Sequence, residues 1–190
     1  MNLSVHSLCF SYQTAPLLRD LDFSLDTGSF VCVLGKNGAG KSTLFQCILN
    51  LQKNYTGMIS LDGQNVKALK EKELAKSIAY IPQLHKQSFP FSVFDTVLMG
   101  TAASLSPFST PKEAQKEAAM EALRLMGMEK YASRSFSHLS GGEQQMVLIA
   151  RALAQKAPIL IMDEPCSNLD YGNQIRLLKK LKQLSALGYL

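Results

Sequence analysis

The segment Gly35–Thr43 constrains the fold of this chain more than any other part of its sequence. It matches the pattern G-x-x-x-x-G-K-[ST] in full, after an apolar run at Phe30–Leu34 and before a predicted helix from about Lys41 to Leu51. The pattern requires this context, in which a buried strand is followed by a glycine-rich loop and a helix. The sequence therefore predicts an α/β fold built on a mainly parallel sheet.

The loop has the residue types of a cradle for phosphate. The residues expected to contact the phosphates are Gly35, Asn37, Gly38, Gly40, Lys41, Ser42 and Thr43. Glycines let backbone N–H groups converge on phosphate oxygens where a Cβ would block them, and a helix start favours the same anion. Lys41 is expected to reach the β- and γ-phosphates, and Ser42 to bind Mg²⁺ through its hydroxyl. The alternative, a glycine-rich turn with a chance lysine, is disfavoured by the flanking elements.

A pair of acidic residues, Asp163 and Glu164, closes a second apolar run, Ile159–Met162. Ligands bind at the carboxyl ends of strands in parallel sheets. Adjacent residues of a strand point to opposite faces, but the chain can turn both toward one site where the strand ends. Asp163 is expected to hold Mg²⁺, directly or through water, and Glu164 to orient and activate the attacking water.

The segment Leu139–Glu143 has two interpretations. Ser140 and Glu143 fit a capping box, which predicts an ordinary helix running to about Gln155. The two glycines between them, however, cost stability in a first helical turn and leave backbone N–H groups uncovered, which suits an anion. Because the chain already has one phosphate cradle, the candidate for this anion is a nucleotide held by another subunit.

Patterns elsewhere predict the remaining elements. Further strands are predicted at Leu3–Phe10, Gly57–Leu61 and Ile78–Ile81, with a turn at Asp62-Gly63. The sequence is helical in character between about Ser88 and His138. In one helix there, Thr110 is the expected N-cap, Pro111 the first helical residue and Glu113 the partner in a capping box. Its expected apolar stripe is Ala118, Ala122, Leu125 and Met126, and Gly127 is expected to end it.

A last helix is predicted from about Asp170. Its expected apolar stripe is Ile175, Leu178, Leu181 and Leu184. Gly188 would end this helix, and Tyr189-Leu190 have the character of the start of another strand. We therefore expect the chain to be a fragment of a longer domain.

Composition limits the class of protein. Hydrophobic residues make up 46% of the 190 and charged residues 18%, as in folded globular domains. The net charge of +5 suits phosphate ligands, nucleic acid or an anionic membrane surface, but the basic residues are dispersed and no nucleic-acid groove is expected.

The four cysteines are widely spaced, and Cys32 and Cys47 lie in apolar patterns, so buried thiols and a reducing, cytosolic compartment are expected. Residues 1–10 do not have the pattern of a signal peptide and no apolar run reaches about 18 residues, so no leader is expected and membrane contact is expected only through partners.

Taken together and in this order, the motifs resemble those of the nucleotide-binding subunits of ATP-binding cassette (ABC) transporters. The stretches that carry the resemblance are Tyr12, Gly35–Thr43, Gln83, Leu139–Glu143, Ile159–Glu164 and Ser167–Asp170. The resemblance covers nearly the whole chain and implies ATP and Mg²⁺ as cofactors. The catalytic residues that it implies are Glu164, Gln83 and Lys41, and the implied Mg²⁺ ligands are Ser42, Gln83 and Asp163.

The resemblance also implies how other residues meet the nucleotide. Tyr12 looks like the aromatic residue that stacks on adenine, although a tyrosine taken singly is more often a core residue. Ser140, Gly141 and Gly142 look like the segment that closes on the γ-phosphate across a head-to-tail dimer. The loop Ser167–Asp170 resembles the one that couples the two sites, and Gln83 would link Mg²⁺ and the water to a transmembrane partner.

The fold implied by the resemblance is a P-loop NTPase core with a mainly parallel sheet, an N-terminal antiparallel β part and an inserted α-helical subdomain. The chain would be a single ABC ATPase domain over residues 1–190. Residues 1–87 and 139–190 would form the core, and residues 88–138 the helical subdomain. The C-terminal part of that domain is expected to be missing.

The implied function is that of an importer ATPase that works as a head-to-tail dimer. Its expected partners are transmembrane permease subunits and a second nucleotide-binding subunit, at the cytoplasmic face of the cell membrane. The stretches Pro90–Val97 and Asn168–Gln174 are similar to those of importers of iron chelates, haem and cobalamin. No residue gives a chemical reason for that substrate, because the substrate never touches this subunit.

One departure from the family concerns histidine. The family carries a switch histidine beyond the catalytic glutamate, whereas the chain's histidines, His6, His85 and His138, all precede Glu164. We therefore expect the 190-residue chain to hydrolyse ATP weakly. Two other functions stay open, a soluble ABC-type ATPase acting on ribosomes or DNA and a non-catalytic ATP-binding remnant. A single cassette with a short spacing between phosphate loop and signature favours the transporter subunit over the soluble ATPase.

Overall fold

The computed structural model describes residues 1–13, 15–83, 91–106, 109–167 and 169–186. They fall into two compact units, Met1–Leu74 with the end of the chain from Ser185, and Ala75–Leu184. The elements in chain order are β1 (Asn2–Tyr12), β2 (Ala15–Asp26), α1 (Lys41–Ile48), β3 (Thr56–Leu61), β4 (Gln64–Asn65), α2 (Glu71–Ser77), β5 (Ile78–Ile81), α3 (Val93–Leu98), α4 (Glu113–Met126), α5 (Gly141–Ala154), β6 (Ile159–Met162) and α6 (Tyr171–Ala186). Short 3₁₀ helices occur at Val66–Ala68, Met99–Ser104, Glu129–Tyr131 and Phe136–His138.

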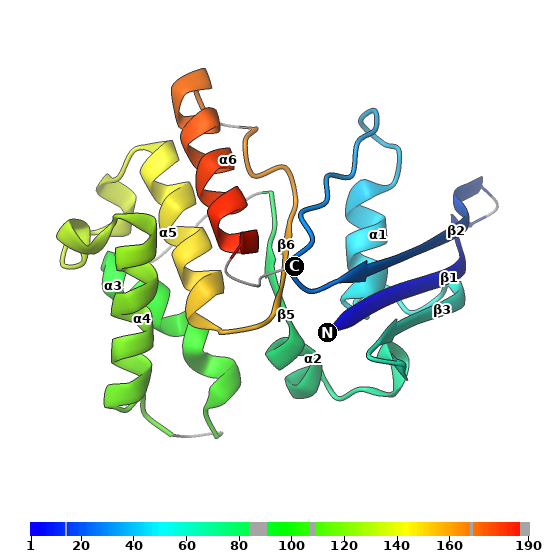
Figure 1. Cartoon of the computed structure of the whole chain (residues 1–190), viewed down its shortest axis with the longest axis horizontal. Helices are drawn as coiled ribbons and strands as arrows, with labels where there is room; N and C mark the ends of the chain where they lie inside the picture. Colours follow the sequence, from blue (N-terminus) through cyan, green and yellow to red (C-terminus); the bar gives the residue numbers. More distant parts are fainter. Residues whose placement is uncertain (14, 84–90, 107–108, 168, 187–190) are drawn as a thin grey trace. The chain divides into compact units, whose positions relative to one another are not determined.

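The first unit contains an antiparallel sheet with strand order β2-β1-β3-β4 (Figure 1). The expected strands at Leu3–Phe10 and Gly57–Leu61 are confirmed within β1 and β3. Alternate residues of β1 are buried, as the period of a strand requires when one face of the sheet is covered; the buried ones are Leu3, Val5, Leu8 and Phe10. The predicted turn at Asp62-Gly63 is also confirmed, since both residues have positive φ (47° and 80°) and join β3 to β4 as a two-residue hairpin.

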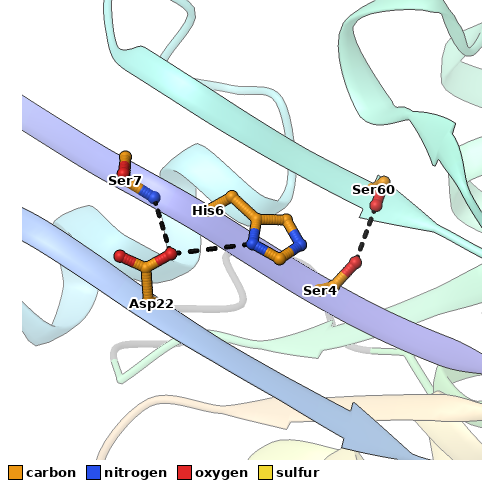
Figure 2. A network of polar contacts seen from close by, with 5 residues as sticks. All are labelled: Ser4, His6, Ser7, Asp22 and Ser60. Atoms are coloured by element: carbon orange, nitrogen blue, oxygen red, sulfur yellow. Dashed lines mark hydrogen bonds and ion pairs between the residues drawn. The ribbon is translucent and has the colours of Figure 1, made fainter.

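A bulge interrupts β1 at His6 and Ser7, where its register with both neighbouring strands shifts. The N–H of Ser7 donates to Asp22 Oδ1 at 3.0 Å, and His6 Nδ1 lies 3.6 Å from the same oxygen (Figure 2). Both side chains of the His6–Asp22 pair are more than half exposed, so the pair contributes little to stability. The bulge depends instead on Gly57 of β3, where a Cβ would overlap the carbonyl oxygens of His6 and Ser7.

The apolar run Phe30–Leu34 is not the buried strand that the sequence predicts. It has no regular secondary structure, and its side chains are exposed, Leu34 to 89%. Cys32 is exposed with them, which contradicts the expectation of a buried thiol. The reason is that a strand needs a neighbour to accept and donate its backbone hydrogen bonds, and none of the described strands pairs with this run.

Helix α1 begins at Lys41 as predicted but ends at Ile48, before the predicted Leu51. Asn50 has a φ of 54°, and a left-handed residue of this kind ends an α-helix. Cys47 lies on the buried face of α1, as expected, and burial raises the pKa of its thiol to about 11. This thiol therefore stays protonated and unreactive at neutral pH.

The second unit is built on β5 and β6, which pair in parallel from Ile78↔Ile159 to Ile81↔Met162. Both strands have the bounds that their apolar runs predict. Helices α3, α4 and α5 pack against one another (Figure 1), and Gly100 lets the backbone after α3 approach the carbonyl of Arg151 in α5. None of the helices in the described part of the chain has both the length and the apolar character needed to cross a membrane.

Helix α4 differs from its prediction at the start and agrees at the end. It begins at Glu113 with the extended Lys112 as N-cap, so Thr110 and Pro111 lie before the helix. The N–H of Lys112 is bound by Gln115 Oε1 at 3.1 Å, which takes the place of the expected capping box. Gly127 ends the helix at φ 70°, as predicted. Of the expected apolar stripe, Ala118, Ala122 and Met126 are buried but Leu125 is exposed.

Helix α6 begins at Tyr171, next to the predicted Asp170, but its apolar stripe was placed incorrectly. The buried residues are Leu177, Leu181 and Leu184, whereas Ile175 and Leu178 are exposed. Steps of three residues rotate about 60° off a single helix face each time, whereas steps of four and then three stay on it. The predicted helix end at Gly188 and the strand start at Tyr189-Leu190 lie outside the described residues, as do residues 84–90.

The close approach at Gly57 predicts a large loss of stability on substitution. Gly57→Ala should lower the free energy of unfolding by about 3 kcal/mol, because left-handed backbone strain adds to a clash with two carbonyl oxygens of β1. Gly63→Ala is the matched control, since Gly63 also has positive φ but an added Cβ would meet no atom within 4 Å. It should cost about 1 kcal/mol. Chemical denaturation of both variants measures the difference, and equal losses would contradict this account.

Candidate nucleotide site

The glycine-rich loop of the first unit has a backbone that only glycine tolerates well. Gly38 and Gly40 have φ of 81° and 94°, and the N–H of Ala39 closes a turn on the carbonyl of Lys36 at 3.1 Å. A Cβ on Gly40 would lie 2.8 Å from the side chain of Leu18 in β2. Positions 35–39 are exposed, so a ligand can reach this loop, although the N–H of Ala39 is already used in the turn. This is a cradle that side chains would fill, and it fits a phosphate group.

Lys41, at the first turn of α1, folds back over this loop. Its Nζ donates to the carbonyl oxygens of Gly35 at 2.9 Å and Lys36 at 3.2 Å. These acceptors carry no charge, and phosphate oxygens would add the attraction of an opposite charge to the bonds that the lysine makes. Next to Lys41, the Ser42 side chain is exposed and Thr43 is buried. Asn37 is exposed within the loop.

Tyr12 lies at the end of β1, in the same unit as the loop. Its ring packs edge-to-face on Phe10, with centroids 4.8 Å apart and planes at 85°. Phe10 is buried while Tyr12 is 51% exposed. The ring is therefore held in place on one side and open on the other, as a stacking surface requires.

In the second unit, the carboxyl ends of β5 and β6 bring together polar residues from distant parts of the sequence. The N–H of Asp163 donates to the carbonyl of Ile81 at 2.9 Å and extends the strand pairing by one bond. Just beyond, Gln83 Nε2 donates to Glu164 Oε2 at 2.5 Å. The parallel register thus joins the candidate catalytic residues Gln83 and Glu164 directly.

The backbone turns sharply at Glu164, whose φ of 47° is in the left-handed region. The N–H and the hydroxyl of Ser167 both donate to the carbonyl of Glu164, each at 3.1 Å, and hold this turn. Such a conformation costs about 1 kcal/mol or more for a residue with a Cβ. It is the physical means by which Asp163 and Glu164 depart from the alternation of a strand.

Asp163 is 95% buried, and the described residues give its carboxylate no hydrogen bond. Burial and the nearby charge of Asp163 together raise the pKa of Tyr80 on β5. Its oxygens are not among the fully buried side-chain atoms that lack a partner in the described part of the chain, and a cation beside them would compensate their charge. No three His, Cys, Asp or Glu side chains gather in the described part of the chain. Mg²⁺ at Asp163 would therefore need oxygens from a nucleotide as well.

The capping box at the start of α5 is confirmed. The N–H of Ser140 donates to Glu143 Oε2 at 2.9 Å, and the N–H of Glu143 donates to Ser140 Oγ at 3.4 Å. The helix continues to Ala154, with Gln155 as its C-cap, as predicted. Gly141 is exposed and Gly142 half-buried. Ser140 and the first amides of α5 thus face solvent, as an anion from outside the unit would require.

Sequence reasoning missed Asn173, which joins two of the predicted segments. Its N–H and side-chain amide donate to Asp170 at 3.0 and 2.6 Å, which caps α6 and lowers the pKa of Asp170. A Cβ on Gly142 would lie 3.1 Å from the Asn173 amide nitrogen. The spacing D-x-x-N before an apolar helix is the signal that could have found it. Asn168, part of the predicted coupling loop, lies outside the described residues.

Comparison with known proteins identifies the family. The family model described as ABC transporter matches residues 18–167. The chain is 46% identical over 184 residues to an ABC transporter ATP-binding protein of Haemophilus influenzae, covering 97% of this chain and 70% of the relative. It is 40% identical to a protein of Helicobacter pylori described as a probable iron chelatin transport ATP-binding protein, covering 96% and 72%. A molybdate import protein of Haemophilus influenzae is 38% identical, covering 96% and 68%.

The structural comparison agrees with the sequence comparison. An ABC transporter of the metal-chelate type, solved in an inward-facing conformation, superposes with a TM-score of 0.85 at 37% identity. The match covers 97% of this chain and 68% of that one. This chain therefore has the fold of a P-loop NTPase cassette. The antiparallel N-terminal sheet and the parallel strands described above are parts of that fold. The chain therefore belongs to the ABC transporter family, as one of its ATP-binding proteins.

Proposed function

We propose that this subunit binds Mg²⁺-ATP on Gly35–Thr43 and hydrolyses it with Glu164 as the base. The observation that carries the proposal is the hydrogen bond between Gln83 and Glu164 beside the buried Asp163. An oriented carboxylate beside a second, largely buried one supports this assignment. The phosphate cradle supplies the nucleotide, and this pair supplies the groups that act on water.

Each residue has a role that its chemistry supports. The loop amides and Lys41 bind the phosphates and stabilise the charge of the transferring γ-phosphoryl group. Glu164 accepts a proton from the attacking water, while the amide of Gln83 holds the carboxylate in position. Ser42, Gln83 and Asp163 would hold Mg²⁺, which would neutralise charge on the phosphates. Tyr12 would stack on adenine through its open face.

The nucleotide of a second copy would complete the site. Ser140, Gly141 and Gly142 would meet its γ-phosphate in a head-to-tail dimer, so each ATP would lie between the loop of one copy and the signature segment of the other. The exposed amides at the start of α5 support this role. Closure on ATP and opening after hydrolysis would then drive the membrane subunits between two states of access.

The proposed partners are a second nucleotide-binding subunit and transmembrane permease subunits, which would hold this subunit at the cytoplasmic face of the cell membrane. Family membership and the likeness to one chain of a transporter structure support this arrangement. Residues 88–138, which include α3 and α4, would form a helical subdomain of a single cassette. A soluble ATPase acting on ribosomes or DNA gains no support, since the relatives reported above are transporter proteins.

The proposed substrate class is an iron chelate or a related metal chelate such as haem or cobalamin. The iron chelatin protein of Helicobacter pylori and the metal-chelate type transporter support this choice. The molybdate import protein is nearly as similar, so molybdate is the substrate that the experiment has to separate from a ferric chelate.

Glu164→Gln should separate ATP binding from hydrolysis. The amide keeps the shape and the contact with Gln83 but cannot take a proton, so steady-state hydrolysis should fall by at least about a hundredfold. ATP binding should persist, and an ATP-bound dimer should accumulate. Lys41→Ala is the contrasting variant, because it should lose ATP binding itself. Hydrolysis at the original rate in Glu164→Gln would show that another group is the base.

The substrate class is tested with the complete transporter in lipid vesicles. A binding protein loaded with a ferric chelate should stimulate ATP hydrolysis and uptake, whereas a molybdate-loaded binding protein should not. The empty binding proteins serve as controls. Stimulation by molybdate alone would refute the chelate assignment while leaving the ATPase assignment intact.

A further inference from the structure

The hydroxyl of Ser140 is committed to a partner within its own helix. Ser140 Oγ donates to Glu143 Oε2 at 2.8 Å, and this is the same oxygen that accepts the N–H of Ser140 at 2.9 Å. A serine hydroxyl has one proton to donate. The group that the proposed function assigns to the γ-phosphate of another copy therefore points its proton at a carboxylate.

Two consequences follow for a phosphate that approaches Ser140. The hydroxyl must turn away from Glu143 before it can donate to a phosphate oxygen. The carboxylate also places a negative charge within one hydrogen bond of the hydroxyl that the phosphate would use, and like charges at such distances repel. Both effects oppose engagement of the signature segment.

Glu143 has further partners that remain when Ser140 turns. Its pKa is lowered first by the N–H of Ser140, then by the hydroxyls of Ser140 and Tyr131, and finally by the charge of Arg134. It is therefore ionised at neutral pH. Two cationic groups lie near the centre of the Tyr131 ring. Arg134 Cζ is 5.4 Å from it, and Lys130 Nζ is 4.9 Å from it. The carboxylate keeps the N–H of Ser140 and the hydroxyl of Tyr131 as donors, and the charge of Arg134, whose guanidinium lies by the Tyr131 ring, acts on it without an ion pair.

We propose that Glu143 is a positioning residue that holds the Ser140 hydroxyl until a nucleotide-loaded second copy arrives, and that Arg134 sets the strength of this restraint. The pair determines how much ATP is needed for two copies to close. Arg134 favours closure because it offsets the charge of Glu143. This inference rests on the proposed role of Ser140 at the partner's nucleotide.

The experiment uses the full gene product carrying Glu164→Gln and measures the ATP concentration at which half the protein dimerises, by sedimentation. Adding Glu143→Gln should lower that concentration by about threefold to tenfold, the effect of one like charge near a protein surface. The glutamine oxygen can still accept the N–H of Ser140, so the cap is kept. Adding Arg134→Gln instead should raise the concentration by a similar factor.

A double-mutant cycle tests whether Arg134 acts through Glu143. In the Glu143→Gln background, Arg134→Gln should have little effect, because no carboxylate remains to be offset. The single-variant effects should also shrink as salt is raised, since Arg134 is exposed and Glu143 is only half-buried. Glu117→Gln on α4 is the matched control, an exposed glutamate whose loss makes the same change in net charge.

The outcomes separate this inference from the proposed function. Absence of any ATP-dependent dimer in the Glu164→Gln parent would contradict the shared site itself. A dimer that forms, but is unchanged or weakened by Glu143→Gln, would overturn the restraint. Thermal melting provides the second readout, because a merely structural cap would lower the melting temperature and weaken the dimer together. The restraint predicts a stronger dimer at an unchanged or slightly lower melting temperature.

Discussion

The parallel pairing of β5 and β6 is the constraint on which the proposed chemistry of the second unit depends. Ile81 and Met162 are the last paired residues of the two strands, so both strands end at the same edge of the sheet. The polar residues that follow each strand therefore lie close together. The register places Gln83 beside Glu164, although 81 residues separate them. A slip of one residue would turn every side chain of a strand to the opposite face. The two apolar runs therefore do more than fill the core, because their burial fixes the register that aligns the site.

The candidate site contains several groups that are poorly satisfied within the protein alone. Asp163 is a buried carboxylate without a hydrogen bond among the described residues, and Glu164 has a left-handed backbone. Lys41 rests on two neutral carbonyls. A cation would compensate the charge of Asp163, and phosphate oxygens would offer Lys41 acceptors of opposite charge. A ligand that binds only the folded state stabilises that state. Nucleotide and Mg²⁺ are therefore expected to raise the free energy of unfolding when they bind.

Local signals predicted much of this fold, and non-local pairing accounts for a principal miss. The capping residues Ser140 and Glu143 and the C-terminal Gly127 lie within a few residues of the bonds that they make, so sequence spacing was enough to place them. The bounds of β5 and β6 followed from apolar length. The run Phe30–Leu34 has the same apolar character, but whether it forms a strand depends on a neighbour elsewhere in the chain. The contact of Gln83 with Glu164 had the same requirement, and it became predictable only through the rule for strand ends.

The second glycine of the signature segment shows how packing links two functional loops. Gly142 does not have positive φ, so backbone conformation does not require glycine there. The lack of space does favour glycine there, because the amide of Asn173 lies where a side chain on residue 142 would be. That amide is bonded to Asp170, which caps α6, while Ser140 caps α5 two residues before Gly142. The starts of α5 and α6 therefore share one packed contact. Since packed contacts shift between discrete arrangements rather than deform smoothly, Asp170 and the signature segment must move together or exchange this contact for another.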